Sequence, residues 1–317
     1  MQQVSVGPVS SRPGAGGTHH LPARRRAHRA WLRDRPAWLF AAPSLAIILV
    51  FIVWPIIQSF RYSLYDWTVG AAEQQWVGLG NYIALFHDEL FWNALRITVI
   101  FAVSSVVLQL ILGYASASAL QAETWLAKAV RSIYFFPTIV ALATIGMVWR
   151  FLLDPNIGLV AGITVAFGGH AVGWLQDPDP ALPTVIFVNV WKNVGFTMVI
   201  LLAGLKGIPA QLYEAARLDG ASGFRLTRHV TLPSIRPTLL LAGIMLTINS
   251  MQVFDLVYVM TNGGPLNHTD TLVNVLYREG FQNFRQGYAS AIAWVLFLII
   301  LAASALQLKL MRYDDVD

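Results

Sequence analysis

Polar side chains recur at helical spacing inside two of the most apolar stretches of this chain. Within a helix, residues three or four positions apart share one face. Amides and charges on such a face can bind a polar solute, or can hold two helices together through an ion pair, and both interpretations remain open here. The residues are Asn189, Lys192 and Asn193 in one stretch, and Asn249, Gln252 and Asp255 in the other, with Tyr258 following as an aromatic ring suited to stacking on a sugar.

Lys192 and Asp255 carry opposite charges. At a rise of 1.5 Å per residue, they lie at similar depth in their stretches and are placed to pair. A purely structural pair and a role in contacting a solute are equally compatible with this spacing. The six polar residues, together with Tyr258, therefore form a candidate substrate path.

The residue patterns of catalysis are missing from the sequence. The chain has no cysteine and its histidines are scattered. There is no Gly-Lys dipeptide to end a phosphate-binding loop, and neither H-E-x-x-H nor G-x-S-x-G occurs. We therefore expect no catalytic residue, no metal site and no cofactor bound by this chain itself.

The composition places most of the chain in lipid. Of its 317 residues, 56% are hydrophobic and only 12% are charged, which is too few charges to cover the surface of a soluble domain. A spanning helix needs about 20 apolar residues. Six stretches meet this requirement, which predicts an all-α, polytopic membrane protein with six transmembrane helices: 38–60, 94–120, 133–153, 184–205, 239–260 and 288–310.

The distribution of basic residues predicts the orientation. If the chain crosses six times, sixteen of its 22 Lys and Arg residues fall on the side of both termini and three on the other side. Because basic loops stay in the cytoplasm, both termini are predicted to be cytoplasmic.

Residues 1–37 form a basic tail that we expect to be disordered and to contact lipid rather than nucleic acid. Residues 311–317 form a second, short cytoplasmic tail. Arg96 and Arg150, near the ends of their spans, are expected to reach the interface.

A polar segment over 206–237 interrupts the apolar pattern on the cytoplasmic side. Pro209 fits the first turn of a helix, and Gly220 fits a left-handed helix cap. A second short helix is expected from Phe224 to Pro233, and Pro237 then opens the fifth span. From these features alone, the segment is either an interfacial helix or a docking element for a cytoplasmic partner.

A resemblance favours docking. Glu214-Ala215-Ala216, then Gly220, then the run V-T-L-P over 230–233 are similar to the EAA signature, E-A-A-x3-G-x9-I-x-L-P, of ABC-importer permeases. The run LAGLKGIPAQLYEAARLDGAS resembles the carbohydrate-uptake type, which includes maltose and glycerol-phosphate permeases. The stretches 76–98 and 253–281 resemble the same family.

The resemblance implies a permease subunit, which forms the path of a solute through the membrane and has no catalytic activity of its own. A second homologous permease, a cytoplasmic ATPase dimer that binds ATP and Mg, and an external solute-binding protein would complete the complex in a bacterial inner (plasma) membrane. The solute would be a sugar or of the glycerol-phosphate type. The residues implied in coupling to the ATPase are Glu214, Ala215, Ala216, Arg217, Asp219, Gly220, Leu232 and Pro233.

Two other classes compete with this interpretation. An ion- or proton-coupled secondary transporter would work through Asp255 and Lys192, but it does not need an ordered cytoplasmic segment. An intramembrane enzyme would need a cluster of acids, bases or metal ligands, which the spans do not contain.

Overall fold

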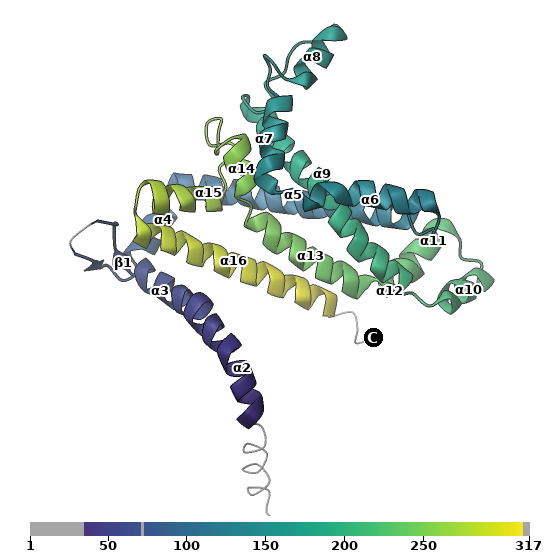
Figure 1. Cartoon of the computed structure of the whole chain (residues 1–317), viewed down its shortest axis with the longest axis horizontal. Helices are drawn as coiled ribbons and strands as arrows, with labels where there is room; N and C mark the ends of the chain where they lie inside the picture. Colours follow the sequence, from purple (N-terminus) through teal and green to yellow (C-terminus); the bar gives the residue numbers. More distant parts are fainter. Residues whose placement is uncertain (1–34, 71–72, 313–317) are drawn as a thin grey trace, which may run out of the picture. The chain divides into compact units, whose positions relative to one another are not determined.

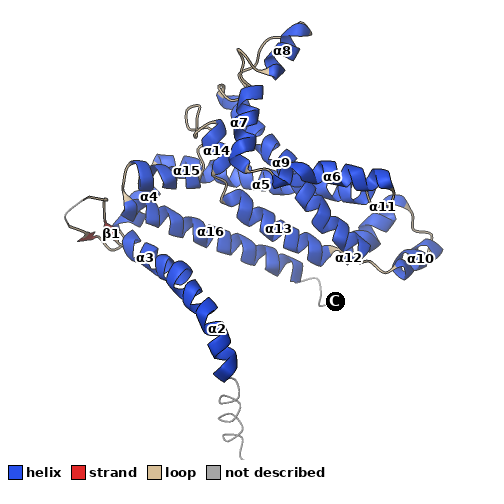
Figure 2. Cartoon of the chain, in the orientation of Figure 1, coloured by secondary structure: helices blue, strands red, loops and turns tan. Residues whose placement is uncertain are grey.

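The computed structural model describes residues 35–70 and 73–312, and the chain divides into two compact units, 1–58 and 59–317. Most of the described residues are helical (Figure 1, Figure 2). One pair of two-residue strands, β1 (Tyr65–Asp66) and β2 (Gln75–Trp76), is antiparallel. The tail predicted to be disordered covers 1–37. Residues 1–34 of it lie outside the described ranges, and 35–37 are helical as the start of α2 (Arg35–Ile48).

The described helices follow one another closely, except across longer connections over 64–79, 167–177 and 261–271. In chain order they are α2 (Arg35–Ile48), α3 (Trp54–Ser63), α4 (Gly80–His87), α5 (Glu89–Ala119), α6 (Trp125–Ile139), α7 (Leu142–Leu152), α8 (Leu159–Ala166), α9 (Pro178–Lys206), α10 (Ala210–Leu218), α11 (Gly223–Leu226), α12 (Leu232–Ser234), α13 (Arg236–Met251), α14 (Asp255–Met260), α15 (Leu272–Tyr277) and α16 (Gln286–Arg312), with π-helical turns at Leu49–Val53, Thr227–Thr231 and Arg278–Gln282.

The first predicted span is one helix, Phe40–Ser63, of 24 residues. A π-helical turn at Leu49–Val53 joins α2 to α3. Pro55 is the second residue after this turn, and a proline ring inside a helix clashes with the carbonyl four residues before it. The wider π turn relieves this conflict without ending the helix.

The second unit is built around two long helices, α5 and α9, which pack against each other. Gly113 of α5 makes their close approach possible, since a Cβ there would lie 2.7 Å from Thr197 Cγ2 of α9. Helix α13 packs on α5 and runs beside α16 (Figure 1). Three clusters of buried apolar side chains fill the spaces between these helices.

The third predicted span, 133–153, is not a single helix. It contains the end of α6 and the whole of α7, which meet at an angle of 97°. Pro137 stands in the last turn of α6, and Val140 after it is extended, with φ −75° and ψ 140°. The backbone of α6 lies directly on α9 at Gly195, where a Cβ would overlap the Tyr134 carbonyl.

The expectation of a continuous fifth helix over 239–260 is wrong. Helix α13 ends at Met251, and the chain is irregular until α14 begins at Asp255. Phe254 interrupts the helical path with φ −132° and ψ −64°. Four helices of the described chain are long and apolar enough to cross a membrane. The number rises to six if each of two bent pairs is one span: α6 with α7, and the stretch Gly223–Ser234 with α13.

The contact at Gly195 gives a test of the packing. We expect Gly195→Ala to lower the melting temperature of the purified protein, because overpacking against backbone costs about 1–3 kcal/mol. Gly243→Ala in α13 is the matched control, since its nearest neighbour would be Leu110 Cδ1 at 4.0 Å. Equal melting temperatures for the two variants would contradict the described α6–α9 contact.

Candidate functional site

Five of the seven residues predicted for the substrate path surround one cavity. Its volume is about 400 Å³, and its walls come from α5, the α6–α7 break, α9, α13 and the irregular segment before α14. The residues on its walls include Asn189, Asn193, Asn249, Gln252 and Asp255, together with Gln109, Thr138, Leu142, Phe196, Ser250 and Phe254. The break in the fifth helix brings Gln252 and Asp255 to this wall.

The two asparagines of α9 form a hydrogen-bonded network. Asn193 donates its Nδ2 to the backbone oxygen and to Oδ1 of Asn189, both at 3.0 Å. Asn189 in turn donates Nδ2 to Ser105 Oγ of α5 at 3.1 Å. The network links α5 to α9 and satisfies buried amides, which would be costly in an apolar surrounding without partners.

Lys192 does not line this cavity and does not pair with Asp255. Its side chain is 6% exposed, and Nζ donates to the backbone oxygen of Thr138 at 3.2 Å. Thr138 Oγ1 donates back to the backbone oxygen of Lys192 at 3.0 Å. The last carbonyls of a helix have no partner within the helix, and a cation is favourable there. Lys192 therefore caps α6 at its break, an arrangement that the sequence analysis did not consider.

Gln109 of α5 is a cavity residue that the sequence analysis missed. It is 1% exposed, and its Oε1 has no hydrogen-bond partner within the described residues. The signal was present as a lone amide in the middle of the apolar stretch 94–120. Only charged residues and clustered amides were considered in the sequence, so a single glutamine escaped notice.

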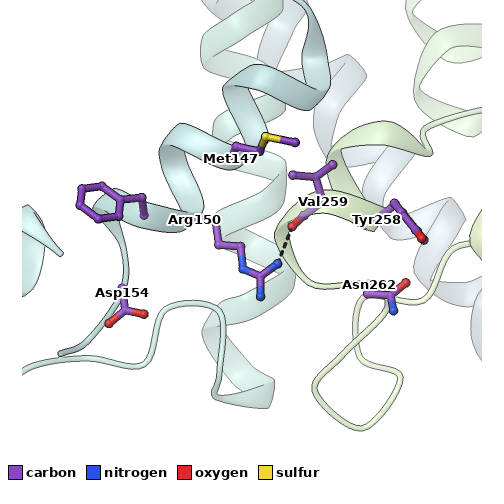
Figure 3. Close-up of a pocket in the computed structure, with 7 residues that line it drawn as sticks. Met147, Arg150, Asp154, Tyr258, Val259 and Asn262 are labelled. Carbon is purple, nitrogen blue, oxygen red and sulfur yellow. Dashed lines mark hydrogen bonds between the residues drawn. The ribbon is translucent and has the colours of Figure 1, made fainter. Parts of the chain in front are cut away.

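Tyr258 lies on a second, neighbouring pocket of about 590 Å³. Figure 3 shows Arg150 of α7 reaching across this pocket, where its Nη1 donates to the Val259 backbone oxygen at 3.2 Å. The Tyr258 ring stacks on Phe254, with ring centroids 5.1 Å apart. Since Phe254 lines the first cavity and Tyr258 lines the second pocket, this aromatic pair contacts both. Arg96 is exposed on α5.

The segment after α9 has the helix–cap–helix form predicted from its sequence. Gly220 follows α10 with φ +78°. Ala221 N donates to the Ala216 oxygen and Gly220 N to the Arg217 oxygen, the bond pair of a Schellman cap. A helical stretch then runs from Gly223 to Ser234, and Tyr213 Oη lies 3.3 Å from Thr231 Oγ1.

The same segment exposes large apolar side chains around its cap. Leu218 is 89% exposed and Phe224 is 74% exposed. Of the predicted coupling residues, Ala216 and Leu232 are half-buried, whereas the others are exposed: Glu214, Ala215, Arg217, Asp219, Gly220 and Pro233. A pocket of about 420 Å³ between this segment and α5 is lined by Glu214 and Arg217.

Glu123 is a second residue that the sequence analysis missed. It lies between α5 and α6, accepts a hydrogen bond from Lys206 at the end of α9, and lies 3.7 Å from Arg131. The bond from Lys206 and the nearby cations lower the pKa of the Glu123 carboxyl below its usual value. The attraction is thus present at neutral pH and is lost as the pH falls through this lowered pKa. Glu123 is largely exposed, so the pair is weak.

Comparison with known proteins identifies the family. Residues 109–312 match the family described as "Binding-protein-dependent transport system inner membrane component". This chain belongs to that family. The match includes every predicted site residue, the last part of α5 from Gln109, and all the later helices that line the cavity.

Named relatives align along most of the permease. YurN of Bacillus subtilis, a probable ABC transporter permease, is 34% identical over 87% of this chain and 95% of its own length. NgcF of Streptomyces coelicolor, a diacetylchitobiose uptake permease, is 36% identical over 94% of this chain and 88% of its own. MalF of Thermococcus litoralis, a trehalose/maltose permease, is 34% identical over 87% and 93%.

A solved structure shares the fold. A bacterial ABC transporter that imports the acidic polysaccharide alginate superimposes with a TM-score of 0.79, covering 90% of this chain and 99% of that chain at 24% identity. The permease is therefore an all-α, multi-pass inner-membrane subunit of an ABC importer, and ATP hydrolysis belongs to partner subunits. The secondary-transporter alternative has no support from these similarities.

The Lys192–Thr138 contact predicts a pattern of energetic coupling. Lys192→Met removes the hydrogen bond to the Thr138 backbone oxygen, and Thr138→Val removes the separate bond to the Lys192 backbone oxygen. Because both bonds hold the same contact between α6 and α9, we expect the two variants to be non-additive in the melting of the purified complex, by about 0.5–3 kcal/mol. Lys192→Met and Asp255→Asn should be closer to additive, since no hydrogen bond or ion pair joins them within the described residues. A larger coupling with Asp255 than with Thr138 would restore the ion-pair interpretation.

Proposed function

We propose that the permease carries a sugar through the cavity lined by Asn189, Asn193, Asn249, Gln252 and Asp255. The observation that supports it best is the convergence of these five polar side chains, from α9, α13, the irregular segment after it and the start of α14, on one space. Polar groups at membrane depth need partners or water, and a hydroxyl-rich solute supplies partners. The chain itself contributes no catalytic group, and ATP and Mg bind to the partner ATPase.

The names of the relatives support a sugar more than a glycerol-phosphate-type solute. They include permeases for diacetylchitobiose, trehalose or maltose, and lactose. The stacked pair Phe254 and Tyr258 offers aromatic faces beside the cavity. Such faces suit the apolar faces of sugar rings, and Tyr258 would guide the solute between the two pockets.

We propose that the segment 206–237 docks on a cytoplasmic ATPase. Leu218 and Phe224 are large apolar side chains that are mostly exposed to solvent. Large apolar side chains exposed on an ordered element mark interaction surfaces. The residues predicted for coupling, from Glu214 to Gly220, share this surface. Leu232 and Pro233 belong to the helical stretch that leads from it into α13. A second permease subunit and an external solute-binding protein complete the proposed importer.

The docking proposal predicts the effect of a charge at the exposed tip. Leu218→Asp should assemble into the membrane normally, because the side chain contributes little to the fold, but it should abolish most of the ATP hydrolysis stimulated by binding protein and sugar. Leu266→Asp is the matched control, since Leu266 is 81% exposed in the loop after α14. Normal stimulated hydrolysis in Leu218→Asp would contradict docking through this segment.

The proposed orientation places both termini in the cytoplasm. Cysteines introduced singly by Ser222→Cys and His268→Cys into this cysteine-free chain should differ in their reaction with a membrane-impermeant thiol reagent in intact cells. His268 is preferred to Asn267, whose φ of +60° disfavours most side chains. Ser222→Cys should be protected and His268→Cys labelled, and the reverse pattern would overturn the orientation.

A further inference from the structure

The cavity presents hydrogen-bond acceptors that have no donor in the protein. The amides of Asn189 and Asn193 are used within their own network with Ser105. Gln109 Oε1, in contrast, is buried without a partner, and no hydrogen bond or ion pair to Asp255 occurs among the described residues. A buried acceptor without a donor is costly, so Gln109 Oε1 asks for an explanation. The Asp255 carboxylate is exposed in the described chain and is open to a solute.

Among the described residues that line the cavity, Asp255 is the one with an ionisable side chain. The nearest candidate for a positive charge, Lys192, is turned toward the Thr138 backbone oxygen and does not line the space. The C-terminal end of a helix carries a partial negative charge. The partial negative charge at the end of α6 therefore partly neutralises the positive charge of Lys192. The carboxylate of Asp255 is then the charge that faces a solute in the cavity.

We propose that Asp255 is a specificity-determining residue that makes the cavity accept uncharged, donor-rich solutes and disfavour anions. Gln109 is the second acceptor. A carboxylate and an amide oxygen receive hydrogen bonds from sugar hydroxyls or amide N–H groups, whereas a phosphate or carboxylate on the solute is repelled by the Asp255 charge. The inference rests on the proposed function, because it concerns the same cavity, and it narrows the solute from sugars and glycerol phosphates to neutral sugars.

The absence of native cysteine makes the charge of the cavity measurable without knowing the solute. Leu142→Cys places one thiol on the cavity wall while keeping every polar group there. In the assembled importer in membranes, this thiol is reacted with three methanethiosulfonate reagents of similar size: the cationic trimethylammonioethyl, the anionic sulfonatoethyl and the neutral hydroxyethyl compound. The ratio of cationic to anionic rates, normalised to the same ratio at the exposed His268→Cys, reports the local potential.

We expect the normalised ratio to exceed one, and Asp255→Asn to lower it by on the order of tenfold, as the loss of a nearby charge in a partly screened site predicts. Lys192→Met should change the ratio by less than Asp255→Asn does. Gln252→Leu, which removes a neutral amide from the same wall, is the control that should leave the ratio within about twofold.

The outcomes separate this inference from the proposed function. If the neutral reagent reacts but the anionic reagent is preferred, or if Lys192→Met moves the ratio more than Asp255→Asn, the charge inference is overturned while the path remains. If none of the reagents, the neutral one included, modifies the thiol of Leu142→Cys, the cavity is not an aqueous path, and both proposals fail together.

Discussion

Lipid offers no hydrogen-bond partners, and this constraint governs how the helices of the second unit are broken and rejoined. Each break frees backbone groups that must be satisfied inside the protein. At the α6–α7 break, the ammonium of Lys192 donates a hydrogen bond to the Thr138 backbone oxygen, and the Thr138 hydroxyl donates one to the Lys192 backbone oxygen. Lys192, which the sequence analysis placed among the candidate solute contacts, is therefore a buried cation that stabilises the α6–α7 break.

The broken helices also create the cavity. In an unbroken fifth helix, Asp255 would lie about one helical turn beyond Gln252 on the same face of the helix. The irregular residues 252–254 instead place Gln252 and Asp255 against the α6–α7 corner and the amides of α9. The network among Ser105, Asn189 and Asn193 uses its own members, so the cavity acceptors left for a solute include Asp255, Gln109, Asn249 and Gln252, and of these Asp255 carries the proposed charge.

The two proposed functional regions have opposite physical character. The cavity gathers polar groups at a depth where they are costly, and the coupling segment displays apolar groups where water would penalise them. They are connected through the backbone, because α9 leads into the segment and α13 leads out of it, and both helices line the cavity. A displacement of the docked segment would therefore reach the cavity walls without an intermediate element.

The sequence by itself determined the features that depend on local chemistry. Apolar runs of membrane length, the Gly220 cap and Pro237 at the start of α13 follow from residue type and spacing, and so does the family, since its signature lies within one segment. The tertiary structure alone decided the partners of Lys192, the break before Asp255 and the role of Gln109. Each of these depends on which backbone atom another helix presents at that depth, as the Tyr134 carbonyl against Gly195 illustrates. Helical periodicity gives the face on which a side chain lies but not the group that it meets there, because that contact is fixed only when the helices pack.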